Sequence, residues 1–119
     1  LRFVRWSDGS TENPRTITLT SDTTLIAEFE LCYAIMTYSV DEAKGVIDET
    51  IGTITGGGQF SEGDSTTITA IPSEGYMFDY FLVYKYSEGT ITTVSFNPMI
   101  FTYINQNYHI EYEKRRRNI

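Results

Sequence analysis

The chain has 119 residues, of which 40 % are hydrophobic and 21 % are charged. This composition is typical of one ordinary folded domain or two very small ones, and it excludes a disordered protein. Sixteen acidic against nine basic residues give a net charge of −7, which argues against binding to nucleic acid or to anionic membranes. No apolar run approaches the ~18–20 residues that a membrane-spanning helix needs.

The first part of the chain contains two predicted strands, at residues 16–20 and 24–30. In both, apolar and polar residues alternate, as in a strand with one buried face. The short polar link at residues 21–23 predicts that the two strands form a hairpin. In the second strand, Phe29 is expected to point inward.

Seven more strands are predicted in the rest of the chain, because Thr, Tyr, Ile and Phe dominate there and Gly or Asn-Pro punctuates at short intervals. No window sustains a helical period over ten residues, and residues 41–49 are expected to form a polar loop. The last strand should place Tyr108, Ile110 and Tyr112 on one face. The seven predicted strands are 33–40, 52–55, 66–71, 76–86, 90–96, 99–104 and 108–113.

The chain also contains an internal repeat. Phe3-x-x-Trp6 recurs as Phe78-x-x-Phe81. An alternating segment that ends in aromatic-Glu occurs twice as well, at residues 25–30 and 108–113.

The repeat predicts an all-β fold of small antiparallel sheet modules. We interpret residues 1–31 as the C-terminal half of a first module, 32–113 as a complete second module, and 114–119 as a basic tail. Missing strands would leave the first module with open edges. We therefore expect it to pair with an absent part, with the second repeat or with another chain.

Several stretches, taken in order, resemble the divergent internalin-B-type B-repeat, a β-rich module that occurs in tandem in bacterial surface and secreted proteins. The resemblance covers nearly the whole chain apart from residues 114–119. It departs from the family at Phe81, where the family usually has Trp, and at residues 82–93, which form a long hairpin. In the second module the stretches are Gly52-Thr-Ile-Thr-Gly-Gly-Gly58, Phe60-Ser-Glu-Gly63, Thr66-Thr-Ile-Thr-Ala-Ile-Pro72 and Glu74-Gly75-Tyr76-x-Phe78. In the first part they are Phe3-Val-Arg-Trp6-Ser-Asp-Gly9, Asn13-Pro-Arg-Thr-Ile-Thr18 and Asp22-Thr-Thr-Leu-Ile-Ala-Glu-Phe29.

The sequence offers no catalytic constellation. The single histidine, His109, shares the polar face of its strand with Glu111 and is expected to be an exposed structural residue. The glycines at 56–58 lack the following Lys-Ser/Thr of a phosphate-binding loop, so they predict a turn. The acidic residues within 41–49 lack the spacing of a calcium loop. We therefore assign no catalytic, metal or cofactor-binding residue and do not expect an enzyme.

Aromatic residues form a stripe along the predicted strand 76–86. A strand of this length can extend past a small core, so Tyr84 and Tyr86, with Tyr103 opposite, are a candidate interaction surface. Plain core packing is the alternative. On a strict strand Phe78 and Phe81 would lie on opposite faces, so we expect a bulge or a bend if both are buried.

Basic residues gather near the C-terminus, at Lys114, Arg115, Arg116 and Arg117. Without these four, residues 1–113 carry a net charge of −11, from five basic and sixteen acidic residues. The cluster is a candidate electrostatic contact with an acidic partner or with a neighbouring copy. The alternative is a solvated chain end.

The resemblance implies a non-catalytic repeat module of an extracellular bacterial protein, at the cell surface or secreted, that acts as a spacer, an adhesive unit or a protein-interaction unit. A second hypothesis is a structural accessory protein of a phage virion or another large assembly, such as a fibre or decoration protein. A third is a glycan-binding appendage that uses Tyr84, Tyr86 and Tyr103. The expected partners are neighbouring repeats, other protein chains or glycan, with oligomers formed through unpaired edge strands.

Overall fold

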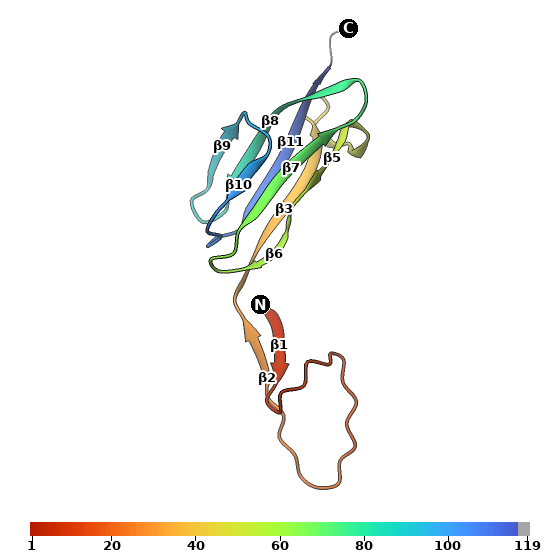
Figure 1. The fold of residues 1–119 in the computed structure, drawn as a ribbon, viewed down its shortest axis with the longest axis vertical. Helices are drawn as coiled ribbons and strands as arrows, with labels where there is room; N and C mark the ends of the chain where they lie inside the picture. The colour runs from red at the N-terminus through yellow and green to blue at the C-terminus, as the bar shows by residue number, and fades with distance from the viewer. Residues whose placement is uncertain (117–119) are drawn as a thin grey trace. The chain divides into compact units, whose positions relative to one another are not determined.

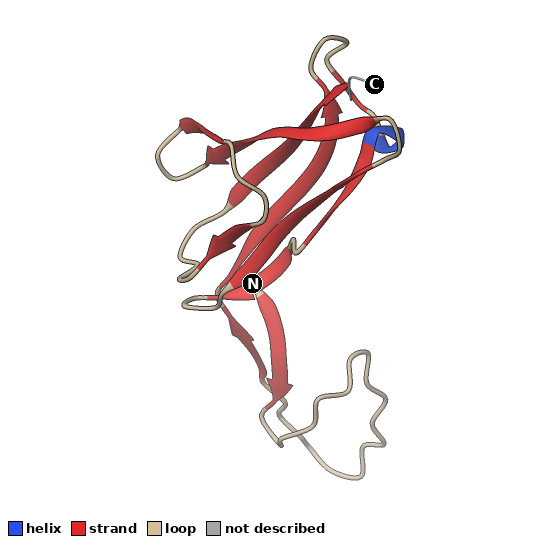
Figure 2. Cartoon of the chain, turned by 45° about the horizontal axis from the view of Figure 1, so that its top comes forward, coloured by secondary structure: helices blue, strands red, loops and turns tan. Residues whose placement is uncertain are grey.

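The computed structural model describes residues 1–116, which are almost entirely β-structure (Figures 1 and 2). The chain divides into two compact units, unit 1 (Leu1–Cys32) and unit 2 (Tyr33–Ile119). In residues 1–116, no helix is long and apolar enough to cross a membrane.

Unit 1 is a two-stranded antiparallel ribbon closed by a long loop (Figure 1). It pairs β1 (Arg2–Trp6) with β2 (Ala27–Glu30). The predicted hairpin between 16–20 and 24–30 is therefore wrong, because residues 16–20 form no strand and β2 pairs with β1.

Side chains explain why β2 pairs with β1. The rings of Phe3 and Phe29 meet edge to face at 6.0 Å between centroids, and Arg5 Nε donates to Glu28 Oε2 at 2.8 Å. Phe29 is nevertheless 56 % exposed, so the expectation that it points into a core is wrong. Unit 1 contains no second layer in which this ring could be buried.

Unit 2 consists of two sheets and one short 3-10 helix. One sheet has three strands in the order β10-β7-β5; the other has the order β4-β3-β11-β8-β9, with β6 also paired to β3. The elements are β3 (Cys32–Asp41), β4 (Val46–Ile47), η1 (Glu49–Ile51), β5 (Gly52–Thr55), β6 (Gly58–Ser61), β7 (Thr66–Pro72), β8 (Tyr76–Lys85), β9 (Thr90–Val94), β10 (Met99–Phe101) and β11 (Tyr108–Arg116).

The all-β prediction is confirmed, and the seven strands predicted after residue 32 are present, β5 with the predicted bounds and the others with shifted ends. The sequence does not predict β4, η1 or β6, which are short; β4 lies in the loop expected at residues 41–49, and η1 and β6 begin at the last residue of an expected loop or turn. One ladder also differs from the expected antiparallel pattern, because β3 and β11 pair in parallel. Between β3 and β11 the chain forms all three strands of the other sheet as well as β4, β6, β8 and β9, and β11 then runs beside β3 in the same direction (Figure 1).

The core of unit 2 forms where the two sheets face each other. As predicted, Tyr108, Ile110 and Tyr112 lie together on the inner face of β11, and all three are buried. The remaining buried core residues are Ile35, Ile51, Ile68, Ala70, Phe81, Val83, Met99 and Ile104.

A β-bulge in β8 brings two aromatic rings onto this inner face. Tyr80 lies opposite Glu113 and Phe78 opposite Lys114, which leaves Asp79 as the extra residue. The ring centroids of Phe78 and Phe81 are consequently 4.9 Å apart, so the predicted bulge is confirmed.

Unit 1 repeats the same irregularity. The register of β1 shifts between Phe3 and Arg5, which leaves Val4 as the extra residue. The bulge again follows the first aromatic residue, and the rings of Phe3 and Trp6 lie 5.5 Å apart. A bulge at matching positions supports the internal repeat. Similar composition would make both segments strands, but it would not place an extra residue at the same point in each.

Candidate interaction surface

The outer face of the larger sheet carries an aromatic cluster centred on His109. The imidazole stacks on Tyr38 from β3, with 4.7 Å between centroids and 28° between planes. Tyr84 from β8 meets it edge-on at 5.0 Å and 88°. His109 and Tyr84 lie directly opposite each other in the ladder between β11 and β8. The expectation of an exposed His109 is corrected, because its side chain is only 29 % exposed.

Glu111 supplies the negative charge of this cluster. Its Oε2 lies 3.7 Å from His109 Nε2. A hydrogen bond to the Glu111 carboxylate, followed by burial, raises the pKa of the Tyr84 hydroxyl. The cluster is thus a set of aromatic rings held beside one carboxylate.

Two exposed apolar side chains extend this surface. Met36 lies opposite His109 on β3, and Ile91 lies opposite Tyr84 on β9. Both belong to the exposed hydrophobic residues of the chain. We call Met36, Tyr38, Tyr84, Ile91 and His109 the outer-face cluster. Tyrosine and methionine are enriched at protein interfaces, because they offer a large apolar area and, for tyrosine, a polar tip.

Of the three tyrosines that were predicted to form a surface, Tyr84 and Tyr86 line one recess together with Ile91, whereas Tyr103 has other neighbours. Tyr84 belongs to the outer-face cluster. Tyr86 follows β8, is exposed, and its backbone N–H donates to Asn107 O at 3.3 Å. Tyr103 is exposed beside Gly63, where an added Cβ would lie 3.2 Å from its ring. Tyr84 and Tyr103 therefore have different neighbours.

Sequence reasoning missed Tyr38 and His109 as partners of Tyr84. The alternation in β11 indicates that His109 points away from the core, but nothing local shows which strands flank it. The parallel ladder brings β3 beside β11 and so supplies Tyr38.

The basic residues near the C-terminus do not form a tail in the described part of the chain. Lys114, Arg115 and Arg116 belong to β11 and lie opposite Phe78, Met77 and Tyr76 of β8. The partners of Lys114 are within unit 2, since its Nζ lies 3.5 Å from Asp41 Oδ1 and 3.5 Å from Glu113 Oε1. Arg115 and Arg116 are exposed. Arg117 lies outside the described residues.

Burial and charge compete within this ion cluster. Burial raises the pKa of Glu113, although its Oε2 accepts a hydrogen bond from Glu42 N at 3.0 Å. Burial alone would lower the pKa of Lys114, but the carboxylates of Glu113 and Asp41 outweigh this effect and raise it. Lys114 therefore stays charged and holds β11 to the end of β3.

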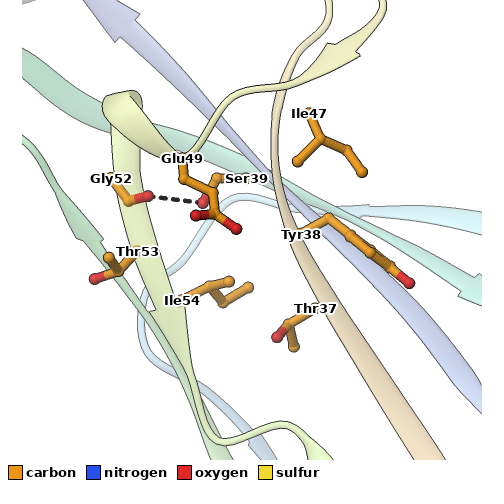
Figure 3. Close-up of a pocket in the computed structure, with 8 residues that line it drawn as sticks. All are labelled: Thr37, Tyr38, Ser39, Ile47, Glu49, Gly52, Thr53 and Ile54. Carbon is orange, nitrogen blue, oxygen red and sulfur yellow. Dashed lines mark hydrogen bonds between the residues drawn. The ribbon is translucent and has the colours of Figure 1, made fainter.

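A recess of about 270 Å³ lies between β3 and β5 (Figure 3). Ser39 Oγ donates to Gly52 O at 2.9 Å across it and joins β3 of the larger sheet to β5, the edge strand of the smaller one. The lining residues are Thr37, Tyr38, Ser39, Ile47, Glu49, Gly52, Thr53 and Ile54. Within residues 1–116, no three His, Cys, Asp or Glu side chains gather as a group that could hold a metal ion.

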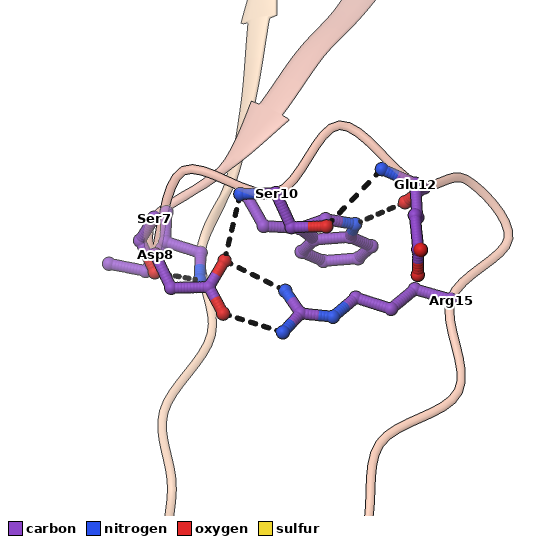
Figure 4. A network of polar contacts seen from close by, with 7 residues as sticks. Ser7, Asp8, Ser10, Glu12 and Arg15 are labelled. Atoms are coloured by element: carbon purple, nitrogen blue, oxygen red, sulfur yellow. Dashed lines mark hydrogen bonds and ion pairs between the residues drawn. The ribbon is translucent and has the colours of Figure 1, made fainter.

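Polar contacts order the loop of unit 1 (Figure 4). Arg15 binds the Asp8 carboxylate with two hydrogen bonds, Nη1 to Oδ1 at 2.8 Å and Nη2 to Oδ2 at 2.5 Å. Trp6 Nε1 donates to Glu12 O at 2.7 Å. The Arg15 guanidinium, assisted by the backbone N–H of Ser10, lowers the pKa of Asp8 to about 2.

Comparison with known families identifies the second unit. The profile of the divergent InlB B-repeat domain matches residues 45–107, which is slightly more than half of the chain. The match includes the three-stranded sheet, β8 and β9, and ends before β11. No curated protein and no solved structure matches the chain. The family is generally non-enzymatic and is usually extracellular or surface-associated. The expected resemblance is confirmed over residues 45–107, and the chain belongs to the divergent InlB B-repeat domain family.

Proposed function

We propose that the chain is a non-catalytic repeat segment of a bacterial surface or secreted protein, in which it acts as a spacer and a protein-interaction unit. Membership of the B-repeat family supports the class and the location. The observation that carries the interaction role is the outer-face cluster, in which Tyr38, His109 and Tyr84 come from three neighbouring strands.

The geometry of this cluster suits contact with another protein. Stacking holds the rings of Tyr38 and His109 in place before a partner arrives, so little side-chain entropy is lost on binding. Exposed apolar atoms of Met36 and Ile91 extend the patch. Rigid aromatic residues surrounded by apolar contacts are typical of the energetically dominant part of an interface.

The location is tested with antibodies raised against the chain. Labelling of intact cells of the source bacterium, or of its growth medium, is expected. Labelling only after cell lysis would contradict the proposed location. Labelling of purified phage particles would instead favour a virion structural protein.

The interaction role is tested by photo-crosslinking in the protein at its natural site. A photoreactive residue replaces Ile91, which is 60 % exposed beside the cluster, or Ile71, which is 54 % exposed on β7 of the other sheet. We expect crosslinks to another protein at position 91 and few at position 71. Equal crosslinking at both positions, or none at either, would contradict the interaction role.

A second pair of variants assigns the contact to the cluster. Tyr84→Ala should reduce the crosslinks at position 91, because it removes a ring that packs on His109. Tyr103→Ala is the control for the loss of a tyrosine ring outside the cluster, since Tyr103 lies beside Gly63 and is more exposed than the half-buried Tyr84. A loss of crosslinks with Tyr103→Ala alone would place the contact elsewhere.

A further inference from the structure

The first and last strands of unit 2 are neighbours in the larger sheet. β3 and β11 pair in parallel, from Ile35 opposite Tyr108 to Ser39 opposite Tyr112 (Figure 1). The chain enters unit 2 at the start of β3 and continues beyond the end of β11. Because the strands run in the same direction, these two points lie at opposite ends of the ladder.

Tension along the chain would therefore slide β3 past β11. The hydrogen bonds between two strands lie across the strand direction, so a pull along the strands loads all of them together. A pull that separates two strands from one end loads them one after another, and each bond then breaks under the whole force.

Packing opposes the sliding motion as well. Ile35, Ile110 and Tyr112 are at most 1 % exposed. A slip of one residue would turn the buried side chains of a strand to the opposite face. β11 is also held on its other side by an antiparallel ladder to β8 that extends from Tyr108 to Arg116.

Unit 1 has the opposite geometry. Its strands are antiparallel, and Arg2 lies directly opposite Glu30. The chain thus enters β1 and leaves β2 at the same end of the ribbon, so tension opens the ribbon pair by pair. An exposed ribbon with no second layer offers little packing to resist this.

We propose that unit 2 is a load-bearing clamp that resists tension by shear of the ladder between β3 and β11, whereas unit 1 yields first at low force. This inference goes beyond the proposed function, because it concerns how the chain carries tension wherever it is anchored. A result against surface location would leave it standing.

The test is single-molecule stretching of the full chain, carrying Cys32→Ser, between two reference domains of known unfolding force. We expect one sharp force peak for unit 2. Extension of its described residues releases roughly 280–300 Å of chain at about 3.3–3.6 Å per residue, less the short folded distance. Unit 1 should extend before this peak without a comparable peak of its own.

A changed pulling direction provides the matched control. Lys44 is exposed in the turn that follows β3, so a thiol handle at Lys44→Cys and a C-terminal handle both pull from the C-terminal end of the parallel ladder. This geometry peels the strands apart, and we expect the rupture force to fall at least about twofold. Urea unfolding of the variant should match the parent, which shows that the fold is unchanged.

Two results would overturn the proposal. One is an equal rupture force in the two pulling directions, which would mean that the parallel ladder is not what resists. The other is extension of unit 2 through its termini without a force peak.

Discussion

Gly56 is the position at which a single added methyl group should destabilise unit 2 most clearly. Its φ is +103°, and a Cβ there would lie 2.0 Å from the backbone oxygen of Thr67 and 3.2 Å from the Cα of Ile68. Thr67 and Ile68 belong to β7, and the Ile68 side chain is fully buried. The strand cannot move away without disturbing the core.

Two contributions set the loss of unfolding free energy expected for Gly56→Ala. An L-residue in the left-handed region costs about 1–2 kcal/mol, and overpacking of a closed site adds about 1–3 kcal/mol or more. We expect Gly56→Ala to lower the free energy of unfolding by about 2–5 kcal/mol. The whole free energy of unfolding of a unit of this size is roughly 4–13 kcal/mol, at about 0.05–0.15 kcal/mol per residue.

Gly45→Ala is the matched control. Gly45 also has a positive φ, +68°, but no atom lies within 4 Å of an added Cβ. Only the conformational cost of about 1–2 kcal/mol applies there. The difference between the two variants therefore isolates the clash with β7.

Urea unfolding of unit 2 can be followed separately from unit 1. All nine tyrosines lie in unit 2, and the single tryptophan, Trp6, lies in unit 1. Tyrosine fluorescence and far-ultraviolet circular dichroism should give a lower midpoint for Gly56→Ala than for Gly45→Ala. Equal midpoints for the two variants would refute the close approach of Gly56 to β7.

Three further changes test the core and the two ion clusters. Phe81→Ala removes a fully buried ring and should lower the free energy of unfolding, measured in urea, by about 3–5 kcal/mol. A decrease below about 1 kcal/mol would contradict the burial of Phe81. Asp8 has a pKa lowered to about 2, so its contribution to unit 1 is present above the ordinary value of 3.8 and is lost as the pH falls towards 2. Trp6 fluorescence should report this change, and Asp8→Asn should abolish it; an unchanged acid transition would count against the pair with Arg15. Glu113 has a raised pKa, so its contribution is complete below 4.5 and is lost as the pH rises through the folded value. Glu113→Gln should therefore gain urea stability relative to the parent as the pH rises above 4.5, and no pH-dependent difference would contradict the burial of this carboxyl.

Local patterns determined much of unit 2. Alternation of apolar and polar residues shows which side chains of β11 face the core, because successive side chains of a strand point to opposite faces. Positive φ at Gly56 and Gly58 agrees with the turn expected at residues 56–58. The bulge also agrees with the sequence, since Phe78 and Phe81 cannot share one face of a regular strand, although only the ladder places it at Asp79.

Pairing between distant strands came only from the tertiary structure. Alternation in residues 24–30 predicts a strand but does not identify its partner. In the structure β2 pairs with β1 and not with the nearer segment at 16–20. The position of Tyr38 beside His109 has the same origin, because it depends on the parallel ladder between β3 and β11.

The sequence by itself thus determined the family, most strands of unit 2 and the buried face of β11, all of which depend on residues close together in the chain. Only the tertiary structure decided which strands are neighbours, and with them the outer-face cluster, the ion pairs of Lys114 and the direction in which unit 2 resists a pull. The physical reason is that a strand leaves its edge hydrogen bonds to be satisfied by any suitable partner, and the choice among partners depends on how the whole core packs.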